Sequence, residues 1–399
     1  MQIPEYVKNV LECLYVSGYE GYMVGGCVRD SIMGRTPNDY DVTTNATPEQ
    51  MIQCFSRFKV IPTGLKHGTV TVLSDGHNIE VTTYRIDGEY ADNRHPKQVR
   101  FTSRLTDDLA RRDFTVNAMA MDASGGVHDP YGGMEDIKSR TIRCVGDAKT
   151  RFGEDGLRIL RCIRFASVLG FDVEEETARQ VHLSRRLLDN ISKERIMTEL
   201  QKLLCGKNAP AVCRDYGDVI EQIIPSLKGG MAHVPQRLER AADNVYVRLA
   251  LLLCDLGADE AGAALRRLKC DNVTHSTVKL LISNRNIDAA GDKIAVKKYL
   301  AQTGADNFTL LTYFAGALTG EDFCALRKQS EQIMAAGECL WLRQLQIDGS
   351  DVRAIGAVGR ETGVILKKLL DSVVCETLPN NRDILIDNAK ILLDELRNV

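Results

Sequence analysis

The sequence predicts an α+β head followed by an all-helical remainder. Two observations lead to this fold class. Before about residue 150, short β-rich runs such as YMVGG, YDVTT, GTVTVL and NIEVTTY alternate with turn residues. Beyond that point, apolar residues recur at intervals of three and four, as in GLRILRCIRFASVLG and RLALLLCDLGADEAGAALRRL. The 399 residues are enough for roughly two to four domains, each with its own core.

Composition narrows the class of protein. Apolar residues make up 44% of the chain and charged residues 26%, as in ordinary globular proteins. The first residues lack a basic, apolar leader, and no run approaches the roughly 18 apolar residues of a membrane span, so we expect a cytoplasmic protein. The twelve cysteines form no CxxC pair, which favours free thiols in a reducing compartment over a zinc site.

Charge is uneven along the chain. The formal net charge of −3 gives no overall attraction to nucleic acid. Residues 138–168, however, hold eight Lys and Arg against three Asp and Glu, a local excess of +5. This basic stretch is a candidate surface for phosphate groups.

The first β-rich run ends in a glycine pair. Gly25 and Gly26 let the backbone approach a ligand closely, and a helix is expected to start near Cys27 to Asp30. The free N–H groups of its first turn would point at a phosphate, and Arg29 adds positive charge. This segment therefore predicts a phosphate-binding turn.

Two carboxylates follow the glycine pair. Asp39 and Asp41 flank Tyr40 in a β-prone run, and side chains two residues apart on a strand point to the same face. Carboxylates this close repel each other unless a cation lies between them, and Mg²⁺ prefers one or two carboxylates together with phosphate oxygens and water. The spacing therefore indicates a site where metal and phosphate meet. The structural alternative is a glycine turn followed by a solvated acidic strand end.

The next two β-rich runs, joined by the SDGH segment at 74–77, predict a β-hairpin. Glu80 lies mid-strand and points away from Ile79 and Val81. If those two side chains face the core, Glu80 faces a cleft, where a third acidic group would complete a two-metal catalytic site with the aspartates. An ordinary exposed strand glutamate is the alternative.

Four motifs occur in a characteristic order. They are GGCVRDSIMG with the following DYD, RRDFTVNAMA at 111–120, DPYGGMEDIKSRTIRCVG at 129–146, and RFGEDGLRILRCIRFASVLGF at 151–171. Together they resemble the class II tRNA nucleotidyltransferases, the CCA-adding enzymes and their bacterial poly(A) polymerase relatives. The similarity covers about the first 200 residues and resumes at 345–380, where the sequence is similar to the tail of many of these enzymes.

The resemblance implies an architecture and a reaction. A polymerase-β-like nucleotidyltransferase head with a small mixed sheet would occupy 1–148, a helical nucleotide-selecting neck 149–205, a helical body 206–344 and a helical, tRNA-binding tail 345–399. The reaction would be template-independent addition of the 3′-terminal CCA of tRNA from CTP and ATP, with Mg²⁺ as cofactor and release of diphosphate. The implied partner is tRNA, bound at its acceptor end and elbow, with no protein partner or membrane.

The resemblance also assigns roles to residues. Asp39 and Asp41 would bind Mg²⁺, and the glycine pair with Arg29 would hold the incoming triphosphate. Arg112 would contact the nucleotide, and Asp113 would accept a hydrogen bond from the ribose 2′-hydroxyl. For Arg112, Asp113 and the preceding arginine, the structural alternative is an ion-pair cluster at a helix end.

Base selection is assigned to the fourth motif. Asp155 and Arg158 lie three apart on a predicted helix and offer an acceptor and a planar donor fork on one face, which can imitate the edge of a base. The resemblance likewise implies that protein side chains choose C and A in turn. Arg161 continues this face, whereas Arg164, a nucleotide contact by resemblance, lies about half a turn from Asp155. The alternatives are an i,i+3 salt bridge for the first pair and RNA phosphate binding for the last two arginines.

Several functions stay open. The segment 62–72 looks like that of the tRNA-directed branch, and the loop at 85–101 has the full length typical of enzymes that complete CCA. An enzyme that adds only A keeps the same loop, so it remains an alternative, followed by a poly(A) polymerase. A non-catalytic RNA-binding protein is disfavoured because both aspartates are present. A small-molecule nucleotidyltransferase would need neither the helix at 154–158 nor the long helical remainder.

Overall fold

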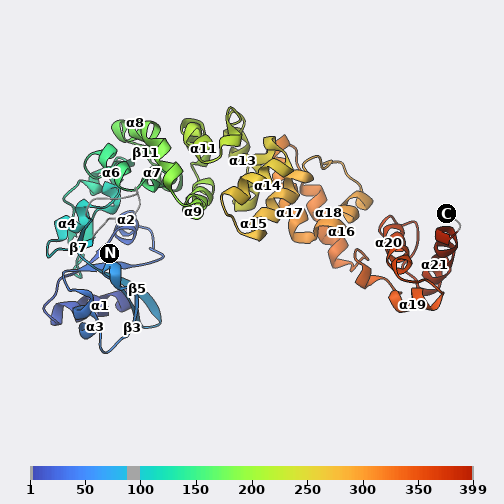
Figure 1. The fold of residues 1–399 in the computed structure, drawn as a ribbon, viewed down its shortest axis with the longest axis horizontal. Helices are drawn as coiled ribbons and strands as arrows, with labels where there is room; N and C mark the ends of the chain where they lie inside the picture. The colour runs from blue at the N-terminus through green and yellow to red at the C-terminus, as the bar shows by residue number, and fades with distance from the viewer. Residues whose placement is uncertain (1–2, 88–98, 398–399) are drawn as a thin grey trace. The chain divides into compact units, whose positions relative to one another are not determined.

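The computed structural model describes residues 3–87 and 99–397, and most of the loop expected at 85–101 lies outside them. The chain divides into two compact units, residues 1–232 and 233–399. A β-sheet with covering helices begins the first unit, and helices build the rest (Figure 1). The predicted α+β head and helical remainder are thus confirmed. The finer divisions at 148, 205 and 344 stay predictions.

The largest sheet within the described residues lies in the head. It is built from β1 (Gly21–Val24), β2 (Asp41–Thr44), β3 (Lys59–Gly64), β4 (Thr69–Ser74), β5 (His77–Thr83), β8 (Ala120–Met121) and β9 (Val127–His128). The strand order is β3-β4-β5-β2-β1-β8-β9. The sheet is mixed, because β2 and β5 are parallel whereas the other neighbours are antiparallel. Short two-stranded ladders join β6 (Arg85–Asp87) to β7 (Val99–Phe101) and β10 (Thr141–Ile142) to β11 (Asp172–Val173).

The predicted hairpin is confirmed. Strands β4 and β5 pair antiparallel as far as Ser74 and His77. The two residues between them, Asp75 with φ 47° and Gly76 with φ 81°, have the left-handed conformations that a type I′ turn needs. This turn fixes the register of β5 and hence the position of Glu80.

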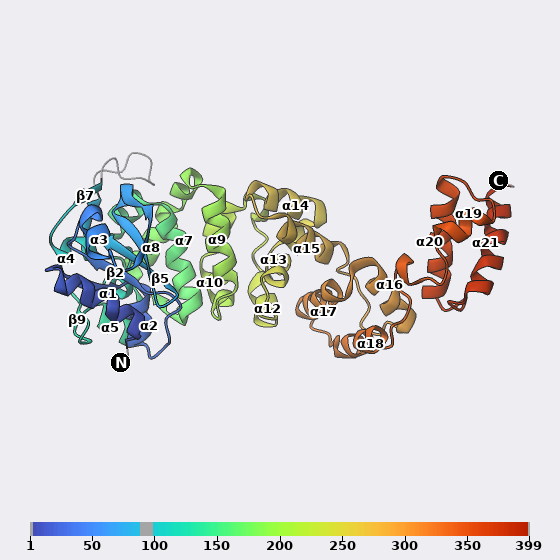
Figure 2. The ribbon, with the colours of Figure 1, turned by 90° about the horizontal axis from the view of Figure 1, so that it is seen from below.

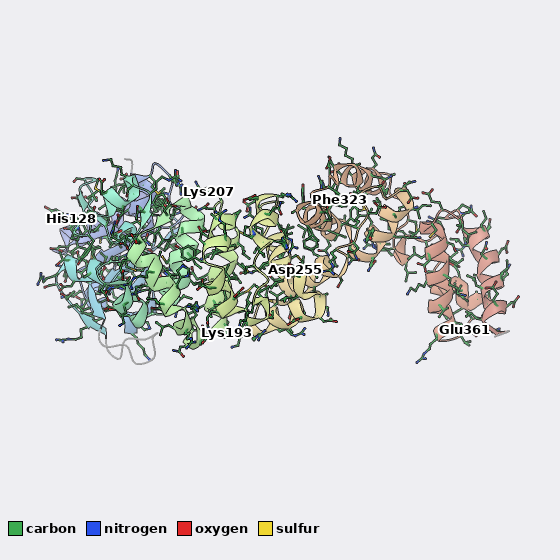
Figure 3. The ribbon with its side chains drawn as sticks, turned by 90° about the horizontal axis from the view of Figure 1, so that it is seen from above. His128, Lys193, Lys207, Asp255, Phe323 and Glu361 are labelled. Atoms are coloured by element: carbon green, nitrogen blue, oxygen red, sulfur yellow. The ribbon has the colours of Figure 1, made fainter. Side chains whose placement is uncertain are left out.

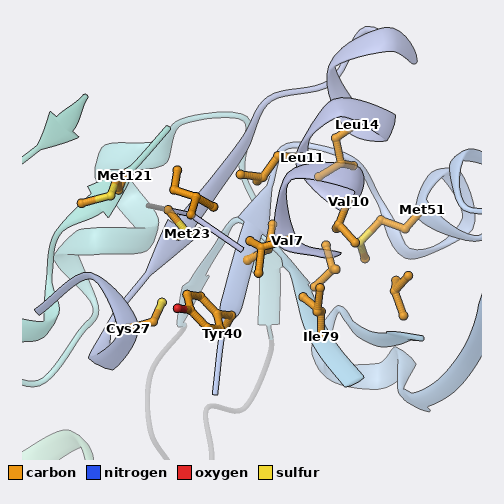
Figure 4. Packing of buried hydrophobic residues seen from close by; sticks show 14 of the residues in the cluster. Val7, Val10, Leu11, Leu14, Met23, Cys27, Tyr40, Met51, Ile79 and Met121 are labelled. Atoms are coloured by element: carbon orange, nitrogen blue, oxygen red, sulfur yellow. The ribbon is translucent and has the colours of Figure 1, made fainter. Parts of the chain in front are cut away.

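Two helices cover one face of the sheet. The face of α1 (Glu5–Val16) that carries Val7, Val10, Leu11 and Leu14 is buried. Together with α3 (Pro48–Cys54) it packs on the buried side chains of the sheet, among them Ile79 (Figure 4). Because side chains alternate along a strand, the next residue of β5 is directed away from this core.

Further helices complete the first unit. In the head these are α2 (Gly26–Ile32), α4 (Leu105–Ala110) and α5 (Gly133–Lys138); α6 (Ala148–Glu154), α7 (Leu157–Phe165), α8 (Glu175–Ser184), α9 (Lys193–Leu204), α10 (Ala209–Asp215) and α11 (Gly217–Ile223) follow. The apolar period of α7 buries Ile159, Leu160 and Ile163 completely, and this helix packs against α9. The predicted helical texture beyond residue 150 is therefore found where it was expected.

The second unit is helical throughout its described residues. It contains α12 (Val234–Glu239), α13 (Val245–Leu253), α14 (Ala258–Arg267), α15 (Asn272–Ser283), α16 (Lys293–Thr303), α17 (Ala305–Thr319), α18 (Cys324–Ala335), α19 (Gly349–Ala354), α20 (Arg360–Val374) and α21 (Arg382–Arg397). The last three share one apolar core, and α20 and α21 lie side by side (Figure 2). None of the helices described in the chain has the length and apolar character needed to cross a lipid bilayer.

Candidate active site

Two carboxylates stand at neighbouring positions on the face of the head sheet opposite α1 and α3. Asp41 opens β2, and its register partner on the parallel strand β5 is Glu80. Both residues are exposed, whereas the next pair in the register, Val42 and Val81, is buried in the core. Glu80 is therefore placed as the hairpin predicted, opposite its apolar neighbours and beside an aspartate.

Asp39 differs from the expectation, because it lies outside the strand. Strand β2 begins at Asp41, which pairs with Val24. The partner strand ends there, since Gly25 turns the chain into α2, and so no ladder remains for Asp39. Tyr40 is nevertheless buried between two exposed aspartates, so the alternation of inward and outward side chains continues past the end of the strand.

The aspartates experience mutual repulsion. Partial desolvation raises the pKa of the Asp41 carboxyl, the negative charge of Glu80 raises it further, and that of Asp39 adds to the shift. The positive charge of Arg112 opposes these effects. A cation at this edge would relieve the repulsion.

The protein alone does not preassemble a cation cage here. Across residues 3–87 and 99–397, no group of three or more His, Cys, Asp and Glu side chains is placed to hold a metal ion. Mg²⁺, however, needs only one or two carboxylates when phosphate oxygens and water complete its shell. Asp39 and Asp41 therefore fit a metal that arrives with a nucleotide.

The glycine turn lies against an arginine. Gly25 has φ +76°, and a Cβ atom there would lie 2.9 Å from Nη1 of Arg112. Gly26 begins α2, close to the expected helix start. Arg29 on this helix is buried, and its guanidinium donates to Oδ1 of Asn117 at 2.7 Å and pairs with Asp30 at 2.8 Å.

The RRD segment is held by a buried carboxylate that sequence reasoning missed. Asp108 on α4 is fully buried and pairs with Arg111 at 2.7 Å and with Arg112 at 3.4 Å. It also accepts a hydrogen bond from the hydroxyl of Thr43, the residue two positions after Asp41. One acidic residue therefore holds both arginines beside β2.

Asp113 is a buried acceptor with several donors. Two guanidinium nitrogens of Arg161 donate to its Oδ2 at 2.8 and 2.6 Å, and the amide of Asn117 donates to Oδ1 at 3.3 Å. Burial alone would raise the pKa of Asp113, but the charge and hydrogen bonds of Arg161 lower it to about 2. The attraction of Asp113 in turn raises the pKa of Arg161.

A polar cavity of about 280 Å³ brings three segments of the first unit together. Its walls come from the RRD segment, from the start of α7 and from α9. The lining residues are Arg111, Arg112, Asp113, Asp155, Leu157, Arg158, Arg161 and Arg195. Five predicted nucleotide-binding residues therefore share one cavity. Its size and charge suit part of an anionic nucleotide.

Asp155 and Arg158 do not share a helix as predicted. The chain breaks between α6 and α7, and Asp155 is extended, with φ −136° and ψ 106°. Its Oδ1 accepts the N–H of Leu157 at 3.0 Å. At the break, Gly156 lies close to the backbone of Leu187. Only glycine fits there, because a Cβ atom would come within 2.9 Å of the carbonyl oxygen of Leu187. Both predicted selectors nevertheless line the cavity.

Asp155 and Arg158, the two predicted base-selecting residues, have different hydrogen-bond partners. Arg158 donates to the Glu154 carboxylate and, at 2.9 Å, to the carbonyl oxygen of Arg111. Asp155 accepts from Nη2 of Arg195 at 2.8 Å. Arg195 lies on α9, which begins at Lys193 (Figure 3). Its place in the cavity had no local sequence signal, because it depends on how α9 packs on α7.

Arg164 lies outside the lining of this cavity. Its Nε donates to Glu199 at 2.7 Å, and its guanidinium lies 3.6 Å from the ring centroid of Phe165. Desolvation lowers the pKa of Arg164, while the Glu199 charge opposes the shift. The pair with Glu199 joins α7 to α9, and the nucleotide contact expected of Arg164 stays a prediction.

One residue joins the two parts of the site. Arg112 lines the cavity, approaches the glycine turn and influences the charge of Asp41. The acidic strand edge, the glycine turn and the polar cavity are therefore neighbours around one guanidinium. A nucleotide with its base in the cavity would direct its phosphates toward the acidic edge.

Comparison with known proteins identifies the family. Residues 21–143 match the poly A polymerase head domain, and residues 170–216 match the family described as a probable RNA and SrmB-binding site of polymerase A. The chain is 35% identical to a CCA-adding enzyme of Oceanobacillus iheyensis, with 94% of each chain covered. It is 36% identical to a CCA-adding enzyme of Geobacillus stearothermophilus, with 92% and 90% covered.

A solved structure agrees along the whole chain. The CCA-adding enzyme of Bacillus stearothermophilus in complex with CTP superposes with a TM-score of 0.86 at 30% identity, covering 100% of this chain and 99% of that one. A Thermotoga maritima CCA-adding enzyme complexed with tRNA shares the fold, with a TM-score of 0.65 at 20% identity, covering 98% and 96%. Sequence and structure give the same answer: the chain belongs to the family of CCA-adding enzymes.

Proposed function

We propose that this protein completes or repairs the 3′-terminal CCA of tRNA, taking CTP and ATP as substrates and using no template. The observation that carries the proposal is the meeting of Asp41, Arg112 and the selector cavity in one place. Full-length similarity to a CCA-adding enzyme that binds CTP supports it.

The chain's own residues bind and orient the nucleotide. Gly25 and Gly26 admit the triphosphate close to the backbone, and Arg29 and Arg112 supply positive charge beside it. We assign Asp113 as the acceptor for the ribose 2′-hydroxyl, and its lowered pKa beside Arg161, which keeps it ionised, supports this role. Such an acceptor favours ribonucleotides over deoxyribonucleotides.

We assign the selection of the nucleotide base to the polar cavity. Asp155 accepts hydrogen bonds, Arg158 donates them, and Arg161 stands on the wall between the sugar acceptor and α9. Cytosine and adenine both present an exocyclic amino group, whereas uracil and guanine present a carbonyl oxygen at the corresponding position. An acceptor and a donor fork can therefore accept C and A and reject the other two.

The acidic edge completes the reaction. Asp39 and Asp41 would hold Mg²⁺, with Glu80 beside them; bound there, the ion supplies charge neutralisation for the phosphates and activation of the attacking hydroxyl. The 3′-oxygen of the RNA forms a bond to the α-phosphorus, the bond to the bridging oxygen of the β-phosphate breaks, and diphosphate leaves with its electron pair. The proton of the attacking 3′-hydroxyl passes to solvent water on the side of Asp39 and Asp41.

RNA contacts extend beyond the site. The basic residues of 138–168 offer charge for the acceptor end, and Lys367 and Lys368 on α20 offer charge for the elbow of the tRNA. Twelve free cysteines accord with a reducing compartment, and we place the activity in the cytoplasm.

Labelled nucleotides test the proposal. The purified protein is incubated with tRNA lacking its 3′ end and with labelled CTP, labelled ATP or both. Addition of two C residues followed by one A is the expected result. Addition of A alone onto a CC end identifies the narrower A-adding activity, and long A tracts identify a poly(A) polymerase.

The metal assignment has its own test. Asp39→Ala and Asp41→Ala are expected to lower incorporation by about a thousandfold or more, because the phosphates lose their charge partner, while binding of tRNA measured by filter retention stays within about twofold. Retained incorporation in either variant contradicts the assignment.

A further inference from the structure

Arg195 holds the carboxylate that we assign to base selection. Its Nη2 donates to Oδ2 of Asp155 at 2.8 Å, and its Nη1 approaches Oδ1 at 3.5 Å. Both side chains are partly buried, with 32% of Arg195 and 17% of Asp155 exposed. Both line the polar cavity. A two-point contact between a planar fork and a carboxylate fixes the plane of the carboxylate as well as its position.

Asp155 needs such a clamp, because its backbone does not provide one. It sits at the break between α6 and α7 in an extended conformation, and its side chain can rotate about two bonds. The N–H of Leu157 engages Oδ1 at 3.0 Å. Arg195 engages chiefly the other oxygen, so the two donors together allow one orientation.

The second selector, Arg158, has anchoring contacts of its own. Arg158 is bound by Glu154 and by the carbonyl oxygens of Arg151 and Arg111, all outside α9. A change at Arg195 therefore alters the acceptor of the selector pair and leaves the anchoring contacts of its donor in place. The two halves of base recognition can be perturbed separately.

We propose that Arg195 is a positioning residue for nucleotide choice. It aims the Asp155 carboxylate so that an oxygen meets the exocyclic amino group shared by cytosine and adenine and opposes the carbonyl oxygen of uracil or guanine. Without Arg195 the carboxylate turns, the amino group loses its partner, and the repulsion against the wrong bases weakens. This inference rests on the proposed function and adds to it a residue outside the sequence motifs.

The consequence is a specific pattern of kinetic change. The residues proposed to contact the triphosphate and those of the acidic edge are unchanged in Arg195 variants. Phosphoryl transfer from a correctly bound nucleotide is therefore expected to persist. Discrimination changes instead, because it depends on the base edge. A site that recognises a polar edge loses selectivity when its acceptor is misplaced.

The experiment compares Arg195→Gln and Arg195→Lys with the wild-type protein. The ratio of kcat/KM for CTP to that for UTP is measured on tRNA that lacks the whole CCA end, and the ratio for ATP to GTP on tRNA ending in CC. We expect Arg195→Gln to lower both ratios about tenfold or more and to raise KM more than it lowers kcat. Arg195→Lys is expected to recover part of the loss, because an ammonium keeps the charge and loses the fork.

Two controls separate positioning from a general effect of lost charge. Arg179→Gln removes an exposed arginine of α8 that pairs with Glu176, and it is expected to change neither ratio. In an Asp155→Asn background, adding Arg195→Gln is expected to lower the ratios by less than about twofold, because its effect passes through the carboxylate. Thermal unfolding of each variant shows whether the fold is kept.

The outcomes are distinguishable. If the wild-type protein incorporates neither C nor A, the proposed function and this inference both fall. If the wild-type protein is active and a folded Arg195→Gln variant keeps its discrimination, this inference alone is wrong. A rise confined to KM for tRNA also overturns it, since that result assigns Arg195 to an RNA phosphate.

Discussion

Asp113 is a buried carboxylate whose contribution to stability depends chiefly on one of its partners. Arg161 binds it with two nitrogens and, against the effect of burial, lowers its pKa to about 2 from the ordinary 3.8. A depressed pKa in the folded state means that ionisation favours folding. The shift corresponds to about 2 kcal/mol of unfolding free energy, present above about pH 4 and lost as the pH falls toward about 2.

Asp113→Asn tests this contribution. At neutral pH we expect the variant to be less stable than the wild type by about 2 kcal/mol, and we expect the difference to shrink on acidification to about pH 3. Urea denaturation at several pH values measures it. The control Asp387→Asn removes an exposed carboxylate paired with Lys390 and is expected to stay within about 0.5 kcal/mol of wild type at neutral pH. A pH-independent deficit in Asp113→Asn contradicts the assignment.

The glycine turn permits a matched pair of substitutions. Gly25 and Gly34 have similar φ angles, +76° and +70°. A Cβ at Gly25 meets Arg112 at 2.9 Å, whereas at Gly34 nothing lies within 4 Å. Alanine costs about 1 kcal/mol of backbone strain at Gly34 and about 1–3 kcal/mol at Gly25, where ψ is −132°, and only Gly25→Ala displaces the guanidinium.

Nucleotide kinetics distinguish the two variants. If Arg112 contacts the triphosphate, Gly25→Ala is expected to raise KM for CTP and ATP about tenfold, and Gly34→Ala less than about twofold. Gly25→Ala is expected to lose more stability than Gly34→Ala in thermal unfolding, and both variants are compared under conditions where they remain folded. Equal KM values in the two variants would remove Arg112 from the proposed triphosphate site.

At the scale of residues, sequence reasoning succeeded where a local rule applies. Alternation along a strand placed Glu80 opposite Ile79, and the structure agrees. It could not give the pairing of Glu80 with Asp41, because that register depends on contacts between strands far apart in the chain. Arg195 was missed for the same reason.

At the scale of elements, the break at Asp155 shows what local propensity leaves out. The segment from 148 to 165 consists mainly of residues that helices tolerate, and each of its two glycines costs only about 1 kcal/mol, so a helix that carries both Asp155 and Arg158 is a reasonable expectation. The backbone of Leu187, which lies in the turn before α9, packs against Gly156. This contact leaves no room for a side chain at position 156. Tertiary contact therefore ends α6.

Gly156→Ala is expected to be costly although its backbone is ordinary. Its φ of −57° suits alanine, but the added Cβ would lie 2.9 Å from the carbonyl oxygen of Leu187, a backbone atom that cannot rotate aside. We expect a loss of about 1–3 kcal/mol in thermal or urea unfolding, together with poorer selection of CTP over UTP as Asp155 moves.

Gly153 supplies the control for that prediction. It lies within α6, and a Cβ atom added there would meet no neighbouring atom within 4 Å. Gly153→Ala is therefore expected to be neutral or to stabilise the protein by about 0.5–1 kcal/mol. If the two glycines respond alike, the close packing against Leu187 is not what ends the helix.

At the scale of the whole molecule, the proposed chemistry is confined to one unit. All the proposed catalytic and nucleotide-binding residues lie within residues 1–232. The sequence predicted the helical character of the second unit from its apolar period, but its packing depends on distant contacts, such as those of Lys297. That buried lysine lies 3.1 Å from Glu338 and 3.3 Å from Glu376. We propose that this unit holds the tRNA.

The end of the second unit offers a surface for such a role. A groove of about 1180 Å³ lies between α16, residues 340–343 and α20, and it is lined by Trp341 and by the exposed cations Lys298 and Lys367 among others. Lys368 follows on the same helix. An aromatic ring among cations suits stacked bases and phosphates.

The double substitution Lys367→Ala with Lys368→Ala separates RNA binding from nucleotide binding. Each lost phosphate contact lowers the salt dependence of binding by about one unit of slope, so we expect KM for tRNA to rise about three- to tenfold and its dependence on salt to weaken. KM for CTP is expected to stay unchanged, since the nucleotide site lies in the other unit. Lys390→Ala, an exposed lysine of α21 already paired with Asp387, is the matched control. If its effect on KM for tRNA equals that of the double variant, general surface charge rather than this face of α20 attracts the RNA.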